Sequence, residues 1–221
     1  MPFCMQNAAR AGNWCNSTVS GLSKPFLRSS VSSVLDSMPP EERKNKSDRI
    51  FQKVASTEHY HLAKETESLM IYLHFDSEVQ TVPQFCAAPD YGMPIVVPFC
   101  YNNEIVPVKV FSFDELQVGV FGILEPKLSI RSQAERLIEP EKLRCVLVPG
   151  LAFDEQCRRL GRGKGYYDRL LKRIQLKRLP PQCVSIGLAF ECQLVSEVPV
   201  NDSDIPVLMV ITEERLIKSR P

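Results

Sequence analysis

The chain has 221 residues, of which 44% are hydrophobic and 24% are charged, and its formal net charge is +1 at pH 7. This length and composition suit one large domain with a short tail and an ordinary buried core. The near-zero net charge excludes a general attraction to nucleic acid or to anionic membranes, and no run approaches the ~18 apolar residues that a membrane helix needs.

The first 22 residues are rich in Ser, Asn and Ala, and the first acidic residue of the chain is Asp36. No apolar segment follows a basic start, so this stretch does not match a secretory leader. We expect residues 1–22 to be a disordered extension, residues 23–221 to form the folded domain, and the protein to be cytoplasmic. The alternative is a mitochondrial import peptide, because such peptides are poor in acidic residues.

Two helices are predicted next. Leu27, Val31 and Leu35 recur every four residues, which is typical of one buried helix face, in a helix that begins near residue 23. Lys24 and Arg28 lie one turn apart in the same helix, so their side chains are expected to point the same way. The Pro-Pro pair at 39–40 interrupts, and acidic residues then begin a second helix that ends near residue 56.

Short apolar runs predict strands, and a later run has helical spacing. The expected strands are 68–73, 94–98, 104–111, 143–148, 184–190 and 207–211. The segment 121–126 is predicted as a turn, and the spacing from Tyr167 to Ile174 as a helix. Strands that alternate with helices predict an α/β fold, a single-domain three-layer sandwich with a mainly parallel, mixed central sheet flanked by helices.

A carboxylate follows the first predicted strand. Glu78 lies just beyond the end of 68–73, where open α/β sheets bind ligands. The alternative is a solvated loop acid.

The stretch from Val148 to Asp168 contains the strongest functional signal. A strand is followed by Gly161, Gly163 and Gly165 at alternate positions, and then by the start of a helix. Backbone N–H groups and the helix dipole attract anions at such a place. The pattern matches neither the Walker A nor the dinucleotide fingerprint. We therefore weigh a phosphate-binding loop against a surface loop made flexible by glycine.

Charge surrounds this loop. Residues 158–178 contain nine Lys or Arg and a single acid, Asp168. The basic run is either a solvated helix face or a patch for RNA. Asp168 is either a Mg²⁺ ligand, since Mg²⁺ is usually held by one or two carboxylates plus phosphate oxygens, or a salt-bridge partner of Arg162 or Arg169.

The cysteines and histidines predict no metal centre. The eight cysteines include no Cys-x-x-Cys pair, and the three histidines lack partners at ligand spacing. Buried free thiols in a reducing compartment are expected, without a zinc site. Cys157 has cationic neighbours, which would lower a thiol pKa, but a bystander role is the preferred interpretation.

At this loop the chain resembles the 5-formyltetrahydrofolate cyclo-ligase family. The resemblance is carried by the block PGLAFD at 149–154 and RLGRGKGYYD at 159–168, with Lys24, Arg28, Glu78, the GILEP segment at 122–126, and VPVNDSD at 198–204. It covers most of the chain from Lys24 onward. It implies that residues 23–221 are a catalytic domain for ATP- and Mg²⁺-dependent conversion of 5-formyltetrahydrofolate to 5,10-methenyltetrahydrofolate, with release of ADP and phosphate.

The resemblance also implies residue roles. It assigns ATP to Lys24, Arg28, Arg159, Leu160, Gly161, Arg162, Gly163, Lys164, Gly165, Tyr166 and Tyr167. It assigns the reduced folate to Glu78, Arg162, Gly163, Lys164, Gly165 and Tyr166, and Mg²⁺ to Asp168 and Asp204. Among these, Lys164, Arg162 and Tyr166 are the expected catalytic residues. Asp168→Ala and Lys164→Ala are each expected to abolish turnover and to leave the fold intact.

One departure and several alternatives remain at this stage. Family members usually carry glycine where this chain has Cys157, so a turn with positive φ would be strained, and we expect the turn to adapt. The expected partner is a small-molecule folate, with no nucleic acid, no membrane and a monomeric state. The alternatives are a non-catalytic RNA-binding module on the same fold and a different ATP-dependent ligase acting on another pterin or acid.

Overall fold

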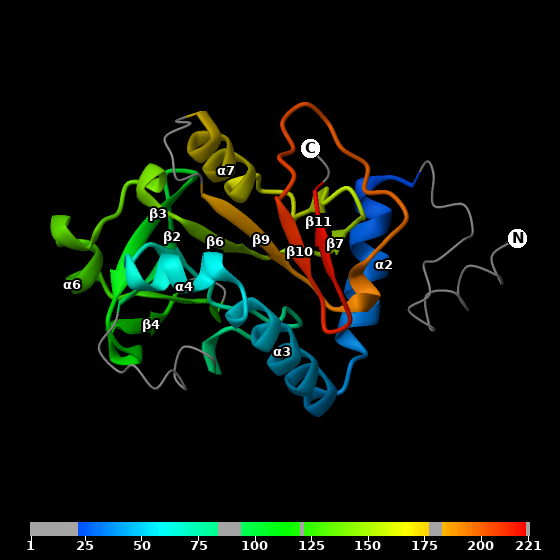
Figure 1. Ribbon diagram of the computed structural model, residues 1–221, viewed down its shortest axis with the longest axis horizontal. Helices are drawn as coiled ribbons and strands as arrows, with labels where there is room; N and C mark the ends of the chain where they lie inside the picture. Colours follow the sequence, from blue (N-terminus) through cyan, green and yellow to red (C-terminus); the bar gives the residue numbers. More distant parts are fainter. Residues whose placement is uncertain (1–21, 84–93, 120–121, 177–182, 220–221) are drawn as a thin grey trace, which may run out of the picture.

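The computed structural model describes residues 22–83, 94–119, 122–176 and 183–219. Its centre is a seven-stranded sheet with the order β11-β10-β9-β6-β1-β2-β3 (Figure 1). The predicted extension, residues 1–22, lies outside the described residues except for its last residue. Its disorder, and the boundary of the folded domain at residue 23, therefore stay predictions.

Five neighbouring strands of the sheet run parallel, and the two outer strands are antiparallel. The parallel strands are β10 (Met209–Ile211), β9 (Val184–Leu188), β6 (Cys145–Val148), β1 (Leu69–Met70) and β2 (Ile95–Tyr101). The antiparallel edges are β11 (Leu216–Lys218) and β3 (Glu104–Val110). The prediction of a mainly parallel, mixed sheet is confirmed.

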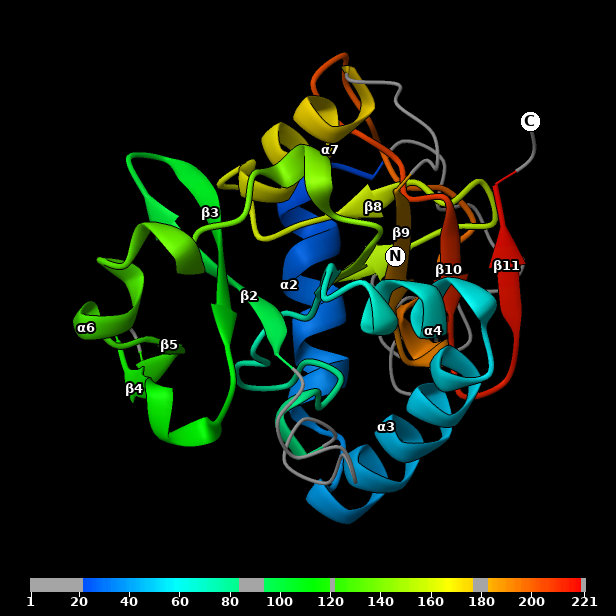
Figure 2. The same cartoon turned by 60° about the vertical axis from the view of Figure 1, so that its left-hand side comes forward.

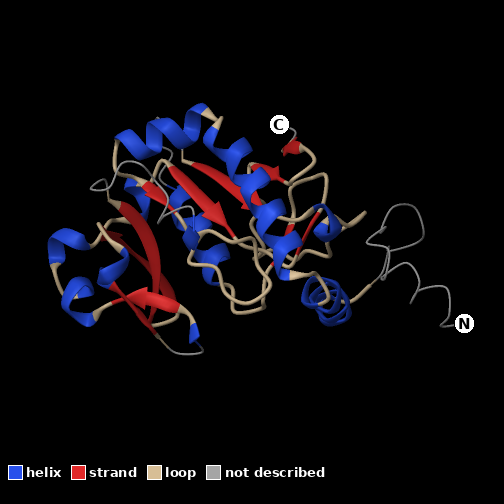
Figure 3. Ribbon diagram, turned by 90° about the horizontal axis from the view of Figure 1, so that it is seen from below, coloured by secondary structure: helices blue, strands red, loops and turns tan. Residues whose placement is uncertain are grey.

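Helices cover both faces of this sheet. One face carries α2 (Lys24–Asp36), α3 (Pro40–Ala55) and α4 (Glu58–Glu65), and the other carries α7 (Tyr166–Leu176). Within β6, Leu147 packs in the cluster with α2 and α3, whereas its neighbour Val148 packs in the cluster with α7. This alternation is what a strand buried on both faces requires. Figures 2 and 3 show the strands inside and the helices outside, which confirms the predicted three-layer sandwich.

The helices begin where local chemistry dictates. Ser23 caps α2 by accepting the N–H of Phe26 (3.4 Å), and Thr57 caps α4 by accepting the N–H of Tyr60 (3.3 Å). Pro40 occupies the first position of α3, where its missing N–H costs nothing. None of the described helices is both long and apolar enough to cross a membrane.

Some elements differ from the prediction. The run 68–73 forms a strand only at Leu69–Met70, although Tyr72 and Leu73 beyond it are buried. An apolar run indicates burial and does not fix how far strand pairing extends. The helix α4 and the outer strand β11 were not predicted.

Small ribbons were also missed. The segment predicted as a turn contains β5 (Leu124–Pro126), which pairs with β4 (Leu116–Val118). Figure 2 shows this ribbon beside α6 (Leu128–Arg131), on the side of the molecule where β3 lies. A second ribbon, β7 (Ala152–Phe153) with β8 (Arg159–Leu160), leads into the glycine loop.

The turn between β7 and β8 contains Cys157 in a left-handed conformation. Its φ is +59°, its N–H donates to the Asp154 carbonyl (2.9 Å), and its own carbonyl accepts the N–H of Val207 (3.0 Å). The expectation that the turn adapts is therefore wrong: two backbone hydrogen bonds hold the shape, and the cysteine adopts it. Burial raises the pKa of the Cys157 thiol to about 11, with Asp154 contributing, so the cationic neighbours do not activate it.

We expect Cys157→Gly to be more stable than Cys157→Ala. Both variants lose the buried sulfur, but only alanine keeps the penalty of about 1–2 kcal/mol that a left-handed conformation imposes on a residue with a Cβ. The larger entropy of glycine in the unfolded chain offsets about 0.4–1 kcal/mol of this gain. Urea unfolding should place the glycine variant roughly 0.5–1 kcal/mol above the alanine variant. The opposite order would show that the turn relaxes.

Candidate functional site

The glycine loop connects the β7–β8 ribbon to the first turn of α7. Gly163 has φ +99° and Gly165 has φ +66°, and a Cβ on Gly163 would lie 3.4 Å from the Arg28 guanidinium. The backbone conformation therefore favours glycine at both positions. The helix begins at Tyr166, directly after the loop, so its N-terminal N–H groups lie beside the loop as predicted.

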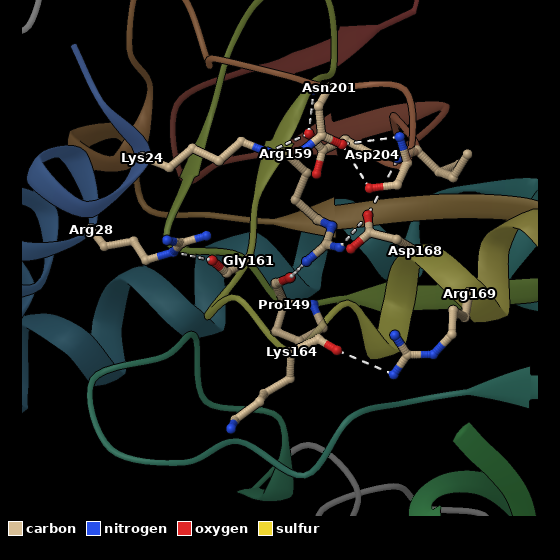
Figure 4. A network of polar contacts seen from close by, with 12 residues as sticks. Lys24, Arg28, Pro149, Arg159, Gly161, Lys164, Asp168, Arg169, Asn201 and Asp204 are labelled. Carbon is tan, nitrogen blue, oxygen red and sulfur yellow. Dashed lines mark hydrogen bonds and ion pairs between the residues drawn. The ribbon is translucent and has the colours of Figure 1, made fainter. Parts of the chain in front are cut away.

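Two arginines hold the loop from opposite sides. Arg28 on α2 donates from Nε to the carbonyl of Gly161 (2.9 Å). Arg169 on α7 donates from Nη2 to the carbonyl of Lys164 (3.1 Å) and from Nε to the carbonyl of Asn103 in the β2–β3 turn (2.8 Å). The two arginines thus hold the loop through hydrogen bonds to its backbone carbonyls, and Figure 4 shows them on either side of it.

The two predicted metal ligands lie together. Asp168 Oδ1 accepts from Arg159 Nη2 (2.9 Å) and from the N–H of Ile205 (3.3 Å), which follows Asp204 in the chain. Asp204 forms an ion pair with Lys24 and accepts the N–H of Asn201 (2.6 Å). Lys24, Asp168 and Asp204 therefore converge from three distant parts of the chain (Figure 4).

The partner of Asp168 differs from both alternatives that the sequence suggested. Neither Arg162 nor Arg169 forms the ion pair; the buried Arg159 does. The Arg159 side chain is only 4% exposed, and its Nη1 also donates to the Pro149 carbonyl (3.3 Å). Its Nε is buried without a hydrogen-bond partner among the described residues, so this guanidinium still has a donor to offer.

Glu78 is not the solvated loop acid of the alternative interpretation. Its side chain is 14% exposed, its Oε1 accepts from Arg162 Nε (3.1 Å), and its Oε2 accepts the N–H of Phe75 (3.1 Å). Burial raises the pKa of Glu78, and the positive charge of Arg162 opposes that rise. The carboxylate that follows β1 thus meets the glycine loop at Arg162.

The remaining predicted site residues differ in their exposure and in the groups that they could offer to a ligand. Lys164 is exposed and its side chain extends away from Asp168 in Figure 4. The Arg169 guanidinium lies over the Tyr166 ring, with its central carbon 5.2 Å from the ring centroid. Tyr167 is partly buried, its buried hydroxyl has no partner among the described residues, and burial raises the pKa of that hydroxyl. Leu160 is 1% exposed in the core, so only its backbone can serve a ligand.

Four of the seven described cations of the basic run form ion pairs with carboxylates. Besides Arg159 and Arg162, Arg158 pairs with Asp154 (2.6 Å) and Arg173 pairs with Glu141 (2.7 Å). The last two basic residues, at 177 and 178, lie outside the described residues. Paired arginines attract phosphate less strongly, which weakens the case for an RNA-binding patch.

His74 shapes the loop that carries Glu78. Its Nδ1 accepts the N–H groups of Thr81 (3.1 Å) and Val82 (3.2 Å), so the ring is a neutral acceptor there. Burial lowers the pKa of His74. No candidate cluster of three or more His, Cys, Asp or Glu side chains for a metal ion occurs in the described part of the chain.

We expect acid to destabilise the protein through His74. As pH falls below about 6.5 the unfolded chain takes up the proton before the folded state does, so the free energy of unfolding decreases. His74→Asn places an amide oxygen where Nδ1 lies and removes the titration. Urea unfolding at pH 7.5 and 5.5 should show a smaller loss for His74→Asn than for the parent, whereas the exposed His61→Asn should lose as much as the parent. An equal loss in all three proteins contradicts the assignment.

Sequence reasoning missed the residues that position the site. Arg169, Asn103 and Ile205 act through backbone atoms or through contacts distant in sequence. The nearest signal was the pair of asparagines after β2, at 102–103, which have φ +47° and +61° as a tight hairpin turn requires.

Comparisons with known proteins identify the family to which this chain is similar. Residues 21–213 match the model of the 5-formyltetrahydrofolate cyclo-ligase family. The 5-formyltetrahydrofolate cyclo-ligase of Escherichia coli (strain K12) is 32% identical over 153 residues, covering 67% of this chain and 79% of that protein. The Mus musculus protein of the same name is 30% identical over 208 residues, covering 86% of this chain and 94% of that protein. The NMR structure of Aquifex aeolicus 5,10-methenyltetrahydrofolate synthetase is similar with a TM-score of 0.75 at 32% identity, covering 90% of this chain and 94% of that chain.

Proposed function

The chain belongs to the 5-formyltetrahydrofolate cyclo-ligase family, and from this premise we propose that it uses ATP and Mg²⁺ to convert 5-formyltetrahydrofolate to 5,10-methenyltetrahydrofolate. ADP and phosphate are the other products. The observation that carries the proposal is the convergence of the Lys24–Asp204 and Arg159–Asp168 pairs beside the glycine loop. Cations, helix N–H groups and two carboxylates at one place suit a phosphate chain with its metal ion.

ATP phosphates are proposed to bind over the loop. The positive-φ backbone at Gly163 and Gly165 and the start of α7 supply N–H groups. Lys24, Arg28 and Arg159 supply positive charge, and the buried Nε of Arg159 is a donor that a ligand could satisfy. The other residues that we propose to contact ATP are Leu160, Gly161, Arg162, Lys164, Tyr166 and Tyr167.

Mg²⁺ fits the two carboxylates at this site. Asp168 accepts the N–H of Ile205, the residue after Asp204, which brings the two aspartates near each other. Mg²⁺ is commonly held by one or two carboxylates together with phosphate oxygens and water. We propose that these two aspartates hold the ion. When bound, Mg²⁺ would neutralise charge on the phosphate oxygens.

The folate is proposed to bind on the Glu78 side of the loop. Glu78 offers a carboxylate within a largely buried setting, and the Arg162 guanidinium lies 5.6 Å from the Phe75 ring centroid. With Gly163, Lys164, Gly165 and Tyr166, these residues border both the phosphate loop and the loop after β1. A folate held there would have its formyl group next to the phosphate chain.

The chain's own residues then perform two tasks. The loop and its arginines hold the γ-phosphoryl group in line with the formyl oxygen, and Lys164, Arg162 and Tyr166 stabilise the charge that spreads over the phosphoryl oxygens. The formyl oxygen attacks the γ-phosphorus as ADP leaves. N10 then attacks the formyl carbon, loses its proton as the ring closes, and expels phosphate. The nucleophile is an amide-type oxygen, so the site needs no strong general base.

The test is the appearance of the methenyl product. Purified protein, 5-formyltetrahydrofolate and MgATP should yield the absorbance of 5,10-methenyltetrahydrofolate, and omission of ATP or addition of EDTA should prevent it. No product at any enzyme concentration contradicts the activity. Product that forms without ATP contradicts only the nucleotide requirement.

We propose that the protein acts as a monomer. Sedimentation equilibrium of the active protein should give a mass near 25.0 kDa.

A further inference from the structure

The ion pair between Lys24 and Asp204 joins two groups with opposite proposed tasks. In the proposed function, on which this inference rests, Lys24 faces phosphate and Asp204 faces the metal ion. In the structure each neutralises the other. A metal ion at Asp204 would lie close to the lysine cation, and a phosphate at Lys24 would lie close to the carboxylate, so either ligand alone opposes the present pair. The side chains of both residues are mostly buried, at 23% and 19% exposed. An unpaired charge at this depth is costly.

The neighbouring pair of Arg159 and Asp168 behaves differently. Arg159 is almost fully buried and is also held by the Pro149 carbonyl, so it stays in place beside Asp168. Lys24 is the first residue of α2 and reaches Asp204 through a flexible four-carbon stem. Asp204 also accepts the backbone N–H of Asn201, a donor from its own loop (2.6 Å). Lys24 is therefore the partner that can leave.

We propose that Lys24 is a specificity-determining residue that makes the site select the metal–nucleotide complex over either component alone. A metal ion alone would take Asp204 and leave the lysine cation unpaired beside a second cation. A nucleotide alone would take Lys24 and leave the Asp204 carboxylate facing phosphate. The metal–nucleotide complex supplies a phosphate for Lys24 and a metal ion for Asp204 at the same time. Both charges then keep a partner of opposite sign.

Arg28 provides a matched comparison for this proposal. It lies one turn after Lys24 on α2 and carries the same charge, but it donates to the Gly161 carbonyl and forms no ion pair among the described residues. Removing Arg28 changes the local charge without releasing a carboxylate. Removing Lys24 changes the charge by the same amount and releases Asp204.

The experiment measures binding of Mn²⁺, as a probe for Mg²⁺, to the nucleotide-free full-length protein by electron paramagnetic resonance. Lys24→Met should bind Mn²⁺ about 5-fold or more tightly than the parent, in the range typical of coupling between sites. Arg28→Met should differ from the parent by less than about 2-fold, because Arg28 donates to a backbone carbonyl and its removal releases no carboxylate, so only a longer-range charge interaction that salt screens is lost. Circular dichroism verifies that each variant is folded.

The outcomes separate the inference from the proposed function. Equal tightening in both variants, or no tightening in Lys24→Met, overturns the exchange. Asp204→Asn tests the metal site itself: Mn²⁺ binding in the presence of a non-hydrolysable ATP analogue should weaken in this variant. If that binding is unchanged, the metal site is misassigned. If it weakens while Lys24→Met behaves like Arg28→Met, only the selection by Lys24 is wrong.

Discussion

An Asp168→Asn variant is expected to lose about 100- to 1,000-fold in kcat/KM with MgATP, the loss typical when one preorganised electrostatic partner is removed. The amide keeps an oxygen for Arg159 Nη2 and for the N–H of Ile205, so the local geometry has a reason to persist. The negative charge that holds Mg²⁺ is lost. Initial rates of methenyl formation at varied MgATP measure the effect, and kcat/KM within a few-fold of the parent would remove Asp168 from the metal site.

The structure also changes which substitution is informative. The sequence-based expectation was that Asp168→Ala leaves the fold intact. Both substitutions remove the carboxylate, but asparagine keeps an oxygen that accepts from the buried Arg159 guanidinium, whereas alanine leaves that donor and the N–H of Ile205 without an acceptor. An unsatisfied buried hydrogen-bonding group typically costs about 1–3 kcal/mol, and more when the group is charged. We now expect Asp168→Ala to be markedly less stable than Asp168→Asn in urea unfolding, so loss of activity in the alanine variant alone would not identify a catalytic role.

A Lys164→Ala variant is expected to lose about 100- to 1,000-fold in kcat while its stability changes by less than about 0.5 kcal/mol. Lys164 is exposed and its side chain extends away from Asp168, so the unliganded fold does not depend on it. Its proposed role is to neutralise charge on the phosphoryl group as that group is transferred. A kcat effect with little change in KM is expected from an interaction made mainly in the transition state.

Lys172→Ala is the matched control for this loss. Lys172 is an exposed lysine on α7, outside the loop. If Lys164→Ala and Lys172→Ala reduce kcat equally, the effect reflects general electrostatics and the catalytic assignment is wrong.

The order of the layers could be predicted from sequence because periodicity records burial. The spacing of Leu27, Val31 and Leu35 identified α2, and the three are at most 1% exposed. The run at 143–148 identified β6, which is buried on both faces. Polar or short elements give no clear hydrophobic period. The edge strand β11 lacks a clear alternation of apolar and polar residues, and β7 and β8 are only two residues long.

Only the part of the candidate site that lies in the glycine motif could be predicted from sequence. Gly163 and Gly165 both have positive φ, the conformation in which glycine is favoured. The partner of Asp168 could not be chosen from sequence, because Arg159, Arg162 and Arg169 are all near in the chain and only burial separates them. Cys157 was misjudged for a similar reason, since the hydrogen bonds that hold its turn come from Asp154 and Val207.

The tie between Arg169 and the Asn103 carbonyl has a practical consequence for anyone who modifies this protein. The tip of a hairpin at a sheet edge is ordinarily a tolerant place for a dye, an affinity tag or an inserted peptide. Here Arg169, which donates to the hairpin tip, also donates to the carbonyl of Lys164 in the glycine loop. We therefore expect a reporter attached at residue 102 or 103 to respond to a ligand bound at the glycine loop. The same attachment is expected to disturb the conformation of that loop.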